Sequence, residues 1–389
     1  MDTSFGSDLS RRTLLRAVPG LAVAAALVPQ AATAAEARPR ANVPLRVRGV
    51  DLSFTLQEEA AGKRFSDGGT VRRVEQIFAQ RGATLVRLRV WVNPPAGYST
   101  QATAITLAQR ARAAGLKVLL DLHYSDFWAD PGKQTTPAAW AGQSLSTMTT
   151  TVRNYTRNIV AAFASAGAPV DMVQVGNEIT GGMLWPNGQI YRSNGEHWSE
   201  FTTLLNAGIA GARAGNPAGH PMEVMVHIDR GGDNGGSRYF YDHLRTFGVS
   251  YDVIGLSYYP FWHGSLATMQ ANLNDLAGRY GKPLVLAETS YPWTTANGDS
   301  LGNFITSTSQ LPDGSRFPPT TAGQAAYFEA LRGVLRSVPN GLGAGFIDWE
   351  PEWIPGVGWE PGAGNPNDNL TMFDFNGRAL PVLTAFRPG

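Results

Sequence analysis

Two glutamates, Glu178 and Glu288, each stand at the end of a short apolar segment, although they lie far apart in the chain. A glutamate is almost never fully buried unless it is paired, so we expect both carboxyl groups at the rim of a sheet, facing one cleft. Glycoside hydrolysis typically requires two carboxyl groups that face each other across a cleft. A single Asn-Glu pair after an apolar strand also fits a buried glutamate paired with an arginine. The matching ends of the two segments favour catalysis.

The reaction would divide its work between the two acids. In a retaining glycosidase one carboxyl group protonates the leaving oxygen and later activates water, the other attacks the anomeric carbon, and the two lie roughly 5–5.5 Å apart. The attacking group must be ionised and the other neutral at the start, so their surroundings must separate the two pKa values. Asn177, directly before Glu178, carries an amide that can donate to a sugar hydroxyl near the reaction centre.

The elements that would position these acids alternate along the chain. Short apolar strands are followed by longer amphipathic stretches, which is typical of repeated βα units around a parallel sheet. Eight such units favour an α/β fold, a single (β/α)8 TIM barrel with long βα loops, over residues 45–389. A doubly wound open sheet should carry a glycine-rich loop after its first strand, but residues 52–55 (Leu-Ser-Phe-Thr) follow instead. The expected strands are 48–53, 84–91, 116–123, 172–178, 222–228, 252–259, 284–288 and 345–349, and the expected helices are 71–82, 102–114, 148–166, 196–214, 239–247, 266–280 and 322–337.

Long βα loops follow the third, fourth, seventh and eighth strands, at residues 124–146, 179–195, 289–321 and 350–369. Loops of this kind gather on the face of a barrel where active sites form. Tryptophans are frequent in them, and such rings can stack on the apolar faces of sugars. The alternative is that these rings only pack the loops onto the barrel. They are Trp128, Trp140, Trp185, Trp262, Trp293, Trp353 and Trp359.

The composition excludes several classes of partner. With 32 Lys plus Arg against 31 Asp plus Glu and no basic run, the chain does not suit a nucleic acid or an anionic membrane surface. Aromatic residues make up 10% of the chain and charged ones 16%, which suits a neutral ligand with many hydroxyl groups. The absence of cysteine excludes disulfides, thiolate metal sites and a cysteine nucleophile.

Residues 1–34 have the form of a signal peptide. Arg11 and Arg12 precede an apolar stretch at 17–28, and Ala32-Thr33-Ala34 resembles a cleavage site. The apolar stretch is shorter than the ~20 residues of a membrane-spanning helix. The paired arginines indicate the twin-arginine route, and a general secretory signal with incidental arginines is the alternative. Either signal predicts a secreted, extracellular protein, in which residues 35–44 form a disordered lead-in.

Two long motifs stand out, at 121–131 (DLHYSDFWADP) and 175–186 (VGNEITGGMLWP), and shorter ones lie at 48–53, 86–91, 255–262, 287–293 and 349–353. Together they resemble the endo-β-1,4-galactanases of glycoside hydrolase family 53, and the two long motifs are the most specific. The resemblance implies a retaining barrel enzyme that cuts β-1,4-galactosidic bonds in plant cell-wall galactan, the type I arabinogalactan of pectin, and we expect a monomer.

The resemblance also implies roles for individual residues. Glu178 is expected to be the acid/base and Glu288 the nucleophile, with Arg87, or else Arg89, holding the nucleophile ionised. Tyr258 would donate to Glu288 or to the sugar, Trp349 would form the floor under the sugar ring, and Asn177 would meet the 2-hydroxyl. The same rim would add the sugar contacts Asp51, His123, Asp126 and Trp128 and the loop tryptophans Trp293 and Trp353. His123 has an alternative reading as a core histidine with a satisfied ring.

Two departures from the family pattern bear on the loops. After His227-Ile228-Asp229 the family has an Asn-Gly pair, but here residues 230–232 read Arg-Gly-Gly. Some bacterial members bind calcium in the seventh loop with clustered Asp, Asn and His, whereas residues 297–302 (NGDSLG) contain no His and few carboxylates. We therefore expect that the protein requires no metal and no cofactor, although the hard oxygen ligands in this loop could still hold a calcium ion.

Two other functions remain as alternatives. The first is a related β-glycanase that acts on mannan, xylan or β-glucan, because the carboxyl pair cannot discriminate sugars that differ by one or two axial hydroxyls. The second is a carbohydrate-binding barrel without catalysis, whose signature would be a missing carboxyl group. Both carboxyl groups are present in this chain.

Overall fold

The computed structural model describes residues 44–94, 97–358 and 364–389. Residues 1–43 lie outside this part of the chain, so the export signal and the lead-in stay predictions, and Trp359 also lies outside it. Along the described residues, no helix is both long enough and apolar enough to cross a lipid bilayer.

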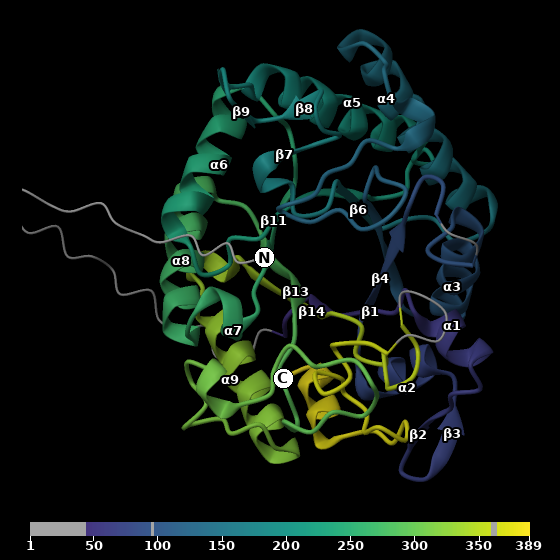
Figure 1. The fold of residues 1–389 in the computed structure, drawn as a ribbon, viewed down its shortest axis with the longest axis vertical. Helices are drawn as coiled ribbons and strands as arrows, with labels where there is room; N and C mark the ends of the chain where they lie inside the picture. Colours follow the sequence, from purple (N-terminus) through teal and green to yellow (C-terminus); the bar gives the residue numbers. More distant parts are fainter. Residues whose placement is uncertain (1–43, 95–96, 359–363) are drawn as a thin grey trace, which may run out of the picture. The chain divides into compact units, whose positions relative to one another are not determined.

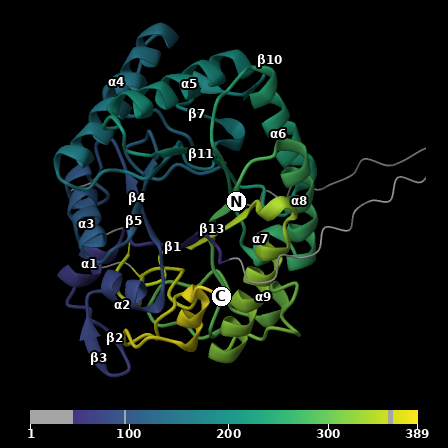
Figure 2. The same ribbon diagram turned by 180° about the vertical axis from the view of Figure 1, so that it is seen from behind.

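Eight parallel strands close into a barrel, and helices form a ring around it (Figures 1 and 2). Strand β1 (Val47–Asp51) pairs with β4 (Leu85–Val90) on one side and with β14 (Gly343–Asp348) on the other, which closes the ring. The predicted TIM barrel is thus confirmed, and an open sheet, which has two free edges, is wrong. The other strands are β5 (Lys117–Leu122), β6 (Met172–Val175), β11 (Glu223–Ile228), β12 (Val253–Ser257) and β13 (Leu284–Thr289).

The seven predicted helices occur in the predicted order, and polar side chains cap several of them, but two short helices, at residues 55–60 and 260–263, were not predicted. Helix α6 (Asn234–Thr246) begins before the predicted residue 239, because Asp233 accepts a hydrogen bond from the Gly236 N–H and starts the helix there. The other helices are α1 (Thr55–Ala60), α2 (Val74–Arg81), α3 (Gln101–Ala113), α4 (Leu145–Ser165), α5 (Trp198–Gly215), α7 (Pro260–His263), α8 (Leu266–Tyr280) and α9 (Thr321–Ser337). The 3-10 turns are η1 (Ala138–Trp140), η2 (Ile179–Gly181), η3 (Thr308–Gln310), η4 (Pro339–Gly341) and η5 (Pro381–Phe386).

In the part of the chain that the structure describes, three short hairpins lie in the loops outside the barrel. They pair β2 (Phe65–Asp67) with β3 (Thr70–Arg72), β7 (Gly182–Met183) with β8 (Gly188–Gln189), and β9 (Tyr191–Arg192) with β10 (Gly195–Glu196). The second and third hairpins belong to the long loop after β6, so that loop has regular structure of its own.

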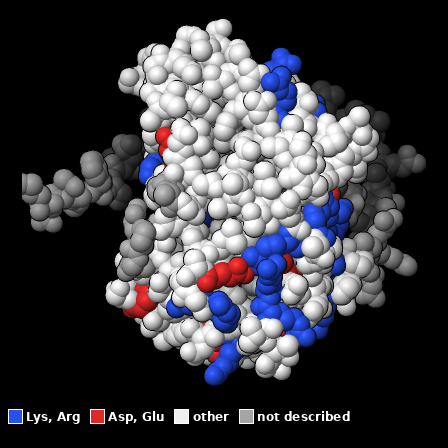
Figure 3. Space-filling view, turned by 90° about the vertical axis from the view of Figure 1, so that its right-hand side faces the viewer, with Lys and Arg blue, Asp and Glu red and all other residues white. Residues whose placement is uncertain are grey.

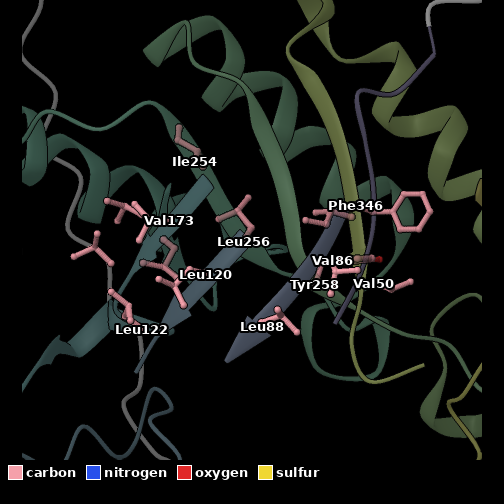
Figure 4. Close-up of a cluster of buried hydrophobic side chains, with 14 of the residues drawn as sticks. Val50, Val86, Leu88, Leu120, Leu122, Val173, Ile254, Leu256, Tyr258 and Phe346 are labelled. Atoms are coloured by element: carbon pink, nitrogen blue, oxygen red, sulfur yellow. The ribbon is translucent and has the colours of Figure 1, made fainter. Parts of the chain in front are cut away.

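Side chains alternate between the two sides of the barrel wall. On β4, Val86, Leu88 and Val90 pack toward the helices, while Leu85 and Arg87 point into the barrel. Figure 4 shows part of the outer layer, with Val50, Leu120, Leu122, Val173, Ile254, Leu256 and Phe346 among its labelled members. The inner layer is filled by Val47, Leu85, Leu119, Met172, Met225, Val253, Val285, Ala287, Ala344 and Ile347. Because these apolar residues fill the barrel, the functional groups lie at the carboxyl ends of the strands.

The face drawn in Figure 3 carries basic and acidic side chains together, mostly in its lower half. Arg110 of α3 pairs with Glu59 at 2.7 Å and with Glu75 at 2.8 Å, and Arg81 of α2 pairs with Asp67. These pairs partly neutralise the arginines, so the surface around α2 and α3 has mixed charge.

Candidate active site

Arg87 is the centre of a buried polar network at the carboxyl ends of the strands. It extends from β4, is 1% exposed, and its Nη1 donates to Asp51 Oδ2 at 2.6 Å. Its Nη2 lies 2.9 Å from Asp121 Oδ2, 2.9 Å from Glu288 Oε1 and 2.8 Å from Asn177 Oδ1. Burial opposes its charge, but the carboxylates of Asp121, Glu288 and Asp51 together raise the pKa of Arg87 above its ordinary value. One guanidinium therefore joins side chains from four strands or strand ends.

Glu288 lies on β13 and is held by two donors. Arg87 bonds its Oε1, and the Tyr259 hydroxyl donates to its Oε2 at 2.9 Å. The residue is 6% exposed and borders an open cavity, so its carboxyl group is held by the protein yet reaches the open side of the site. A carboxylate fixed by a guanidinium and a hydroxyl is well placed to attack an atom in front of it.

Glu178 leaves β6 by a sharp turn. Gly176 has a φ of 87° and Glu178 a φ of 48°, so the strand ends at Val175 and not at the predicted residue 178. A Cβ on Gly176 would come within 2.6 Å of Ile179, which makes this position unsuitable for a larger residue. The left-handed backbone at Glu178 is uncommon for a residue with a side chain and directs its carboxyl group toward Ser257 of β12, whose Oγ lies 2.6 Å from Glu178 Oε1.

The two glutamates meet at one cavity of about 360 Å³. Ser257 links them, because it contacts Glu178 and its Cα is paired with that of Glu288 between β12 and β13. The cavity also has aromatic walls, and its lining includes Trp128, Tyr259, Phe261, Trp262, Phe304 and Trp349. The two acids therefore lie in one cavity with flat apolar rings, an arrangement that suits the binding of a sugar chain.

The surroundings of the two carboxyl groups shift their pKa values by different amounts. Burial raises the pKa of Glu178 well above its ordinary value, and the neighbouring charge of Glu288 raises it further. Burial also raises the pKa of Glu288, but Arg87 and the hydrogen bond from Tyr259 oppose that rise. Within the pair Glu288 is therefore the group that ionises first, and Glu178 keeps its proton to a higher pH.

The tyrosine beside Glu288 is Tyr259, which corrects the expectation for Tyr258. The register between β12 and β13 shifts at Ser257, and alternation along the strand turns Ser257 and Tyr259 inward and Tyr258 outward. The Tyr258 hydroxyl donates to the carbonyl oxygen of Gly264 at 2.7 Å, within the outer core.

The other proposed contact residues divide into those that line the cavity and those that support it. His123, Trp128, Asn177 and Trp349 line it. Its floor is supported by Asp51, Arg87 and Arg89, of which Arg89 pairs with Glu350 at 2.9 Å and not with Glu288. The remaining three residues stabilise the loops. Asp126 accepts hydrogen bonds from the backbone N–H groups of Asn93 and Ala138. Trp293 donates from Nε1 to Thr371 Oγ1, and Trp353 is buried and stacks on Phe54.

His123 has a fully bonded ring at the edge of the cavity. Its Nδ1 accepts from Trp91 Nε1 at 3.3 Å and from the Ala129 N–H at 3.1 Å, so the ring proton is on Nε2 and faces Asp121 Oδ2 at 3.0 Å. Burial lowers the pKa of His123, which keeps the ring neutral. The ring is thus both a cavity wall and a satisfied core histidine.

Sequence reasoning missed Gln174, His227 and Ser257, which also face the interior. Gln174 donates to Asp121 Oδ1 at 2.6 Å, and His227 lies between Asn177 and Ser257. Gln174 and His227 each interrupt an apolar run, since β6 reads MVQV and residues 224–228 of β11 read VMVHI, whereas Ser257 ends β12. A polar residue at an inward position of such a strand was the available signal.

Comparison with known proteins agrees with this geometry. The model of glycosyl hydrolase family 53 matches residues 47–386. An arabinogalactan endo-beta-1,4-galactanase of Humicola insolens is 35% identical over 88% of this chain and 99% of its own. The GH53 catalytic domain of Ignisphaera aggregans superposes with a TM-score of 0.82 at 35% identity, covering 88% of this chain and 96% of that domain. A structure of fungal beta-1,4-galactanases gives 0.76 at 35% identity, covering 88% and 99%. The chain belongs to glycosyl hydrolase family 53.

Proposed function

We propose that the protein is an endo-β-1,4-galactanase that cuts galactan, or the type I arabinogalactan of plant cell walls, with retention of configuration. The observation that carries the proposal is the pair Glu178 and Glu288 at one aromatic-lined cavity, with pKa values that their surroundings separate. The Humicola insolens relative, which is named for this activity, supports the choice of substrate.

In the first step the ionised carboxyl group of Glu288 attacks the anomeric carbon. The bond between that carbon and the leaving oxygen breaks, and Glu178 gives its proton to the leaving oxygen. Arg87 and the Tyr259 hydroxyl hold Glu288 in place, and Arg87 compensates its charge. In the second step Glu178 takes a proton from water, the water oxygen attacks the anomeric carbon, and Glu288 leaves as a carboxylate.

Sugar binding would use the rings and the remaining polar groups of the cavity. Trp349 and Trp128 are half-buried, with ring centroids 6.0 Å apart, and form one wall. Trp262 is 59% exposed and lies against Phe304, so it offers a second flat surface at the mouth. Asn177 donates one N–H to the Ala129 carbonyl, and its second N–H is available for the 2-hydroxyl of the sugar.

A panel of purified polysaccharides tests this function. The enzyme should release short galacto-oligosaccharides from β-1,4-galactan, with the β-anomer as first product by NMR, because a double displacement retains configuration. Mannan, xylan and β-glucan should be cleaved at least about tenfold more slowly, since their hydroxyls are oriented differently. Faster turnover of one of these glycans would identify another β-glycanase, and binding without turnover of any of them would indicate a carbohydrate-binding barrel.

We propose further that the reaction needs no metal. In the seventh loop Asp299 is occupied by the protein itself, because Oδ1 accepts from the Leu301 N–H at 2.9 Å and Oδ2 from those of Gly356 at 3.0 Å and Asn365 at 2.9 Å. We expect enzyme dialysed against EDTA to keep kcat/KM within about twofold, since a calcium ion would have to displace these bonds. A loss of activity that added calcium restores would contradict this.

A further inference from the structure

Behind Glu178 a chain of hydrogen bonds runs through Ser257 and His227 to Asn177. His227 and Ser257 are 0% exposed and Asn177 is 5% exposed, so water does not compete for these contacts. Neither His227 nor Ser257 has a part in the chemical steps described above. This chain of hydrogen bonds nevertheless determines which of its atoms carry protons, because each side chain in it has a limited number of donors.

The amide of Asn177 can point in only one direction. Its Oδ1 accepts from Arg87 Nη2 at 2.8 Å and from Gln174 Nε2 at 3.0 Å, and its Nδ2 donates to the Ala129 carbonyl oxygen at 2.9 Å. Exchanging the two amide atoms would set donor against donor and oxygen against oxygen. The Asn177 atom that faces His227 is therefore an acceptor.

His227 consequently carries its ring proton on Nδ1. Nδ1 lies 3.1 Å from Asn177 Oδ1, which can only accept. Burial, helped by the charge of Arg87, lowers the pKa of His227 well below its ordinary value, so the ring is neutral and has a single proton. Nε2 is then an acceptor, and Ser257, whose Oγ lies 2.9 Å away, donates its hydroxyl proton to it.

The one proton of the Ser257 hydroxyl is thereby used. Its Oγ also lies 2.6 Å from Glu178 Oε1, and it can only accept at that contact. Glu178 must then carry a proton on Oε1 and donate it to Ser257. All the hydrogen bonds of the chain are satisfied together only while Glu178 is protonated.

We propose that His227 and Ser257 are positioning residues that raise the affinity of Glu178 for its proton. The inference rests on the acid role proposed for Glu178 above. When Glu178 becomes a carboxylate, the Ser257 hydroxyl turns toward it, and Nε2 of His227 loses its donor. A buried acceptor left unsatisfied is costly, so the chain favours the return of a proton from water to Glu178 in the second step.

Other charged groups surround this chain and contribute to its titration. Those that face Glu178 are Glu288, Asp229 and Arg87, and those that face His227 are Arg87, Asp121 and His123. Arg87 stays charged at every accessible pH, and Glu288 ionises before Glu178. The alkaline limb of the rate profile therefore reports Glu178, and the acid limb reports Glu288.

The first experiment removes the acceptor that Ser257 uses. His227→Met fills the space without an Nε2, so Ser257 can serve the Glu178 carboxylate at no cost. We expect the alkaline limb of kcat/KM to move to lower pH by about one to two units. His227→Gln is the matched control, because its amide offers an N–H to Asn177 and an oxygen to Ser257, and its alkaline limb should stay near that of the wild type.

A merely structural role would lower the rate equally at all pH values, so an unmoved alkaline limb in His227→Met would overturn the proposal. The second measurement uses the wild-type protein and does not depend on a variant that folds. Nitrogen-15 NMR of the histidine rings should show His227 as the neutral Nδ1–H tautomer across the active pH range. An Nε2–H tautomer, or an imidazolium in that range, would overturn it. Inactivity on galactan would refute the proposed substrate alone, because the tautomer needs no substrate and the pH profile is taken on whichever glycan the wild type cleaves.

Discussion

Glycine in place of Glu288 is expected to lower kcat/KM on galactan by at least about 10⁴-fold, because the variant lacks the group that attacks the anomeric carbon. The space left beside Arg87 and the Tyr259 hydroxyl can admit a small anion. With azide and a dinitrophenyl β-galactobioside, the variant should form the α-glycosyl azide, since azide enters from the side that Glu288 occupied. The anomer of the product, read by proton NMR, is the measurement.

Glu178→Gly is the matched control, because it should give the opposite anomer. A dinitrophenolate leaves without a proton, so the glycosyl-enzyme on Glu288 still forms, and azide then attacks it from the face that water normally uses. The product should be the β-glycosyl azide. The reverse assignment of anomers would exchange the two roles, and wild-type activity in either variant would remove that residue from the mechanism.

The barrel was predictable from the sequence because its strands are short and apolar and lie between helical stretches. Val173 and Val175 on β6 and Leu284 and Leu286 on β13 are buried against the helices, and polar residues are few within the strands and gather where the strands end. Glu178 and Glu288 were recognisable for the same reason, since an acid at the end of such a strand has few purely structural explanations.

The contacts around the acids were not predictable, because they depend on local departures from regular geometry. Alternation along β12 turns Tyr259 and not Tyr258 toward the interior, but the register shift at Ser257 decides which residues of β13 lie beside it, and no periodicity in the sequence encodes that shift. Trp353 and Trp262 both follow a strand in the sequence, yet one is buried on Phe54 and the other is exposed at the cavity mouth. Their difference arises from how distant loops pack, which a single segment does not record.

Arg87→Met is expected to destabilise the fold by about 3–5 kcal/mol at neutral pH, because it leaves buried carboxylates without their cation. Asp51, Asp121 and Glu288 all lie within 3 Å of the guanidinium nitrogens, the longest of these contacts being 2.9 Å. Urea unfolding followed by circular dichroism measures the loss. Arg87→Lys is the control: it keeps the charge and should lose less stability, but its one nitrogen cannot take the places of both Nη1, which bonds Asp51, and Nη2, which bonds Glu288, so its activity should still fall about 10²-fold.

The pH dependence separates lost charge from lost packing. In the wild type burial opposes the ionisation of Asp121, but Arg87 and His123 hold its pKa at about 2. This is below the unfolded value, so its stabilisation is present above that value and is lost as the pH falls through 2. In Arg87→Met burial dominates, which raises the folded pKa of Asp121 above its unfolded value and raises further the folded pKa of Glu288, which burial already raises in the wild type. The variant then loses stability as the pH rises, and the difference in unfolding free energy between the wild type and the variant should be larger at pH 8 than at pH 5. An equal difference in unfolding free energy at both pH values would mean that Arg87 stabilises the barrel by its packing and not by its charge.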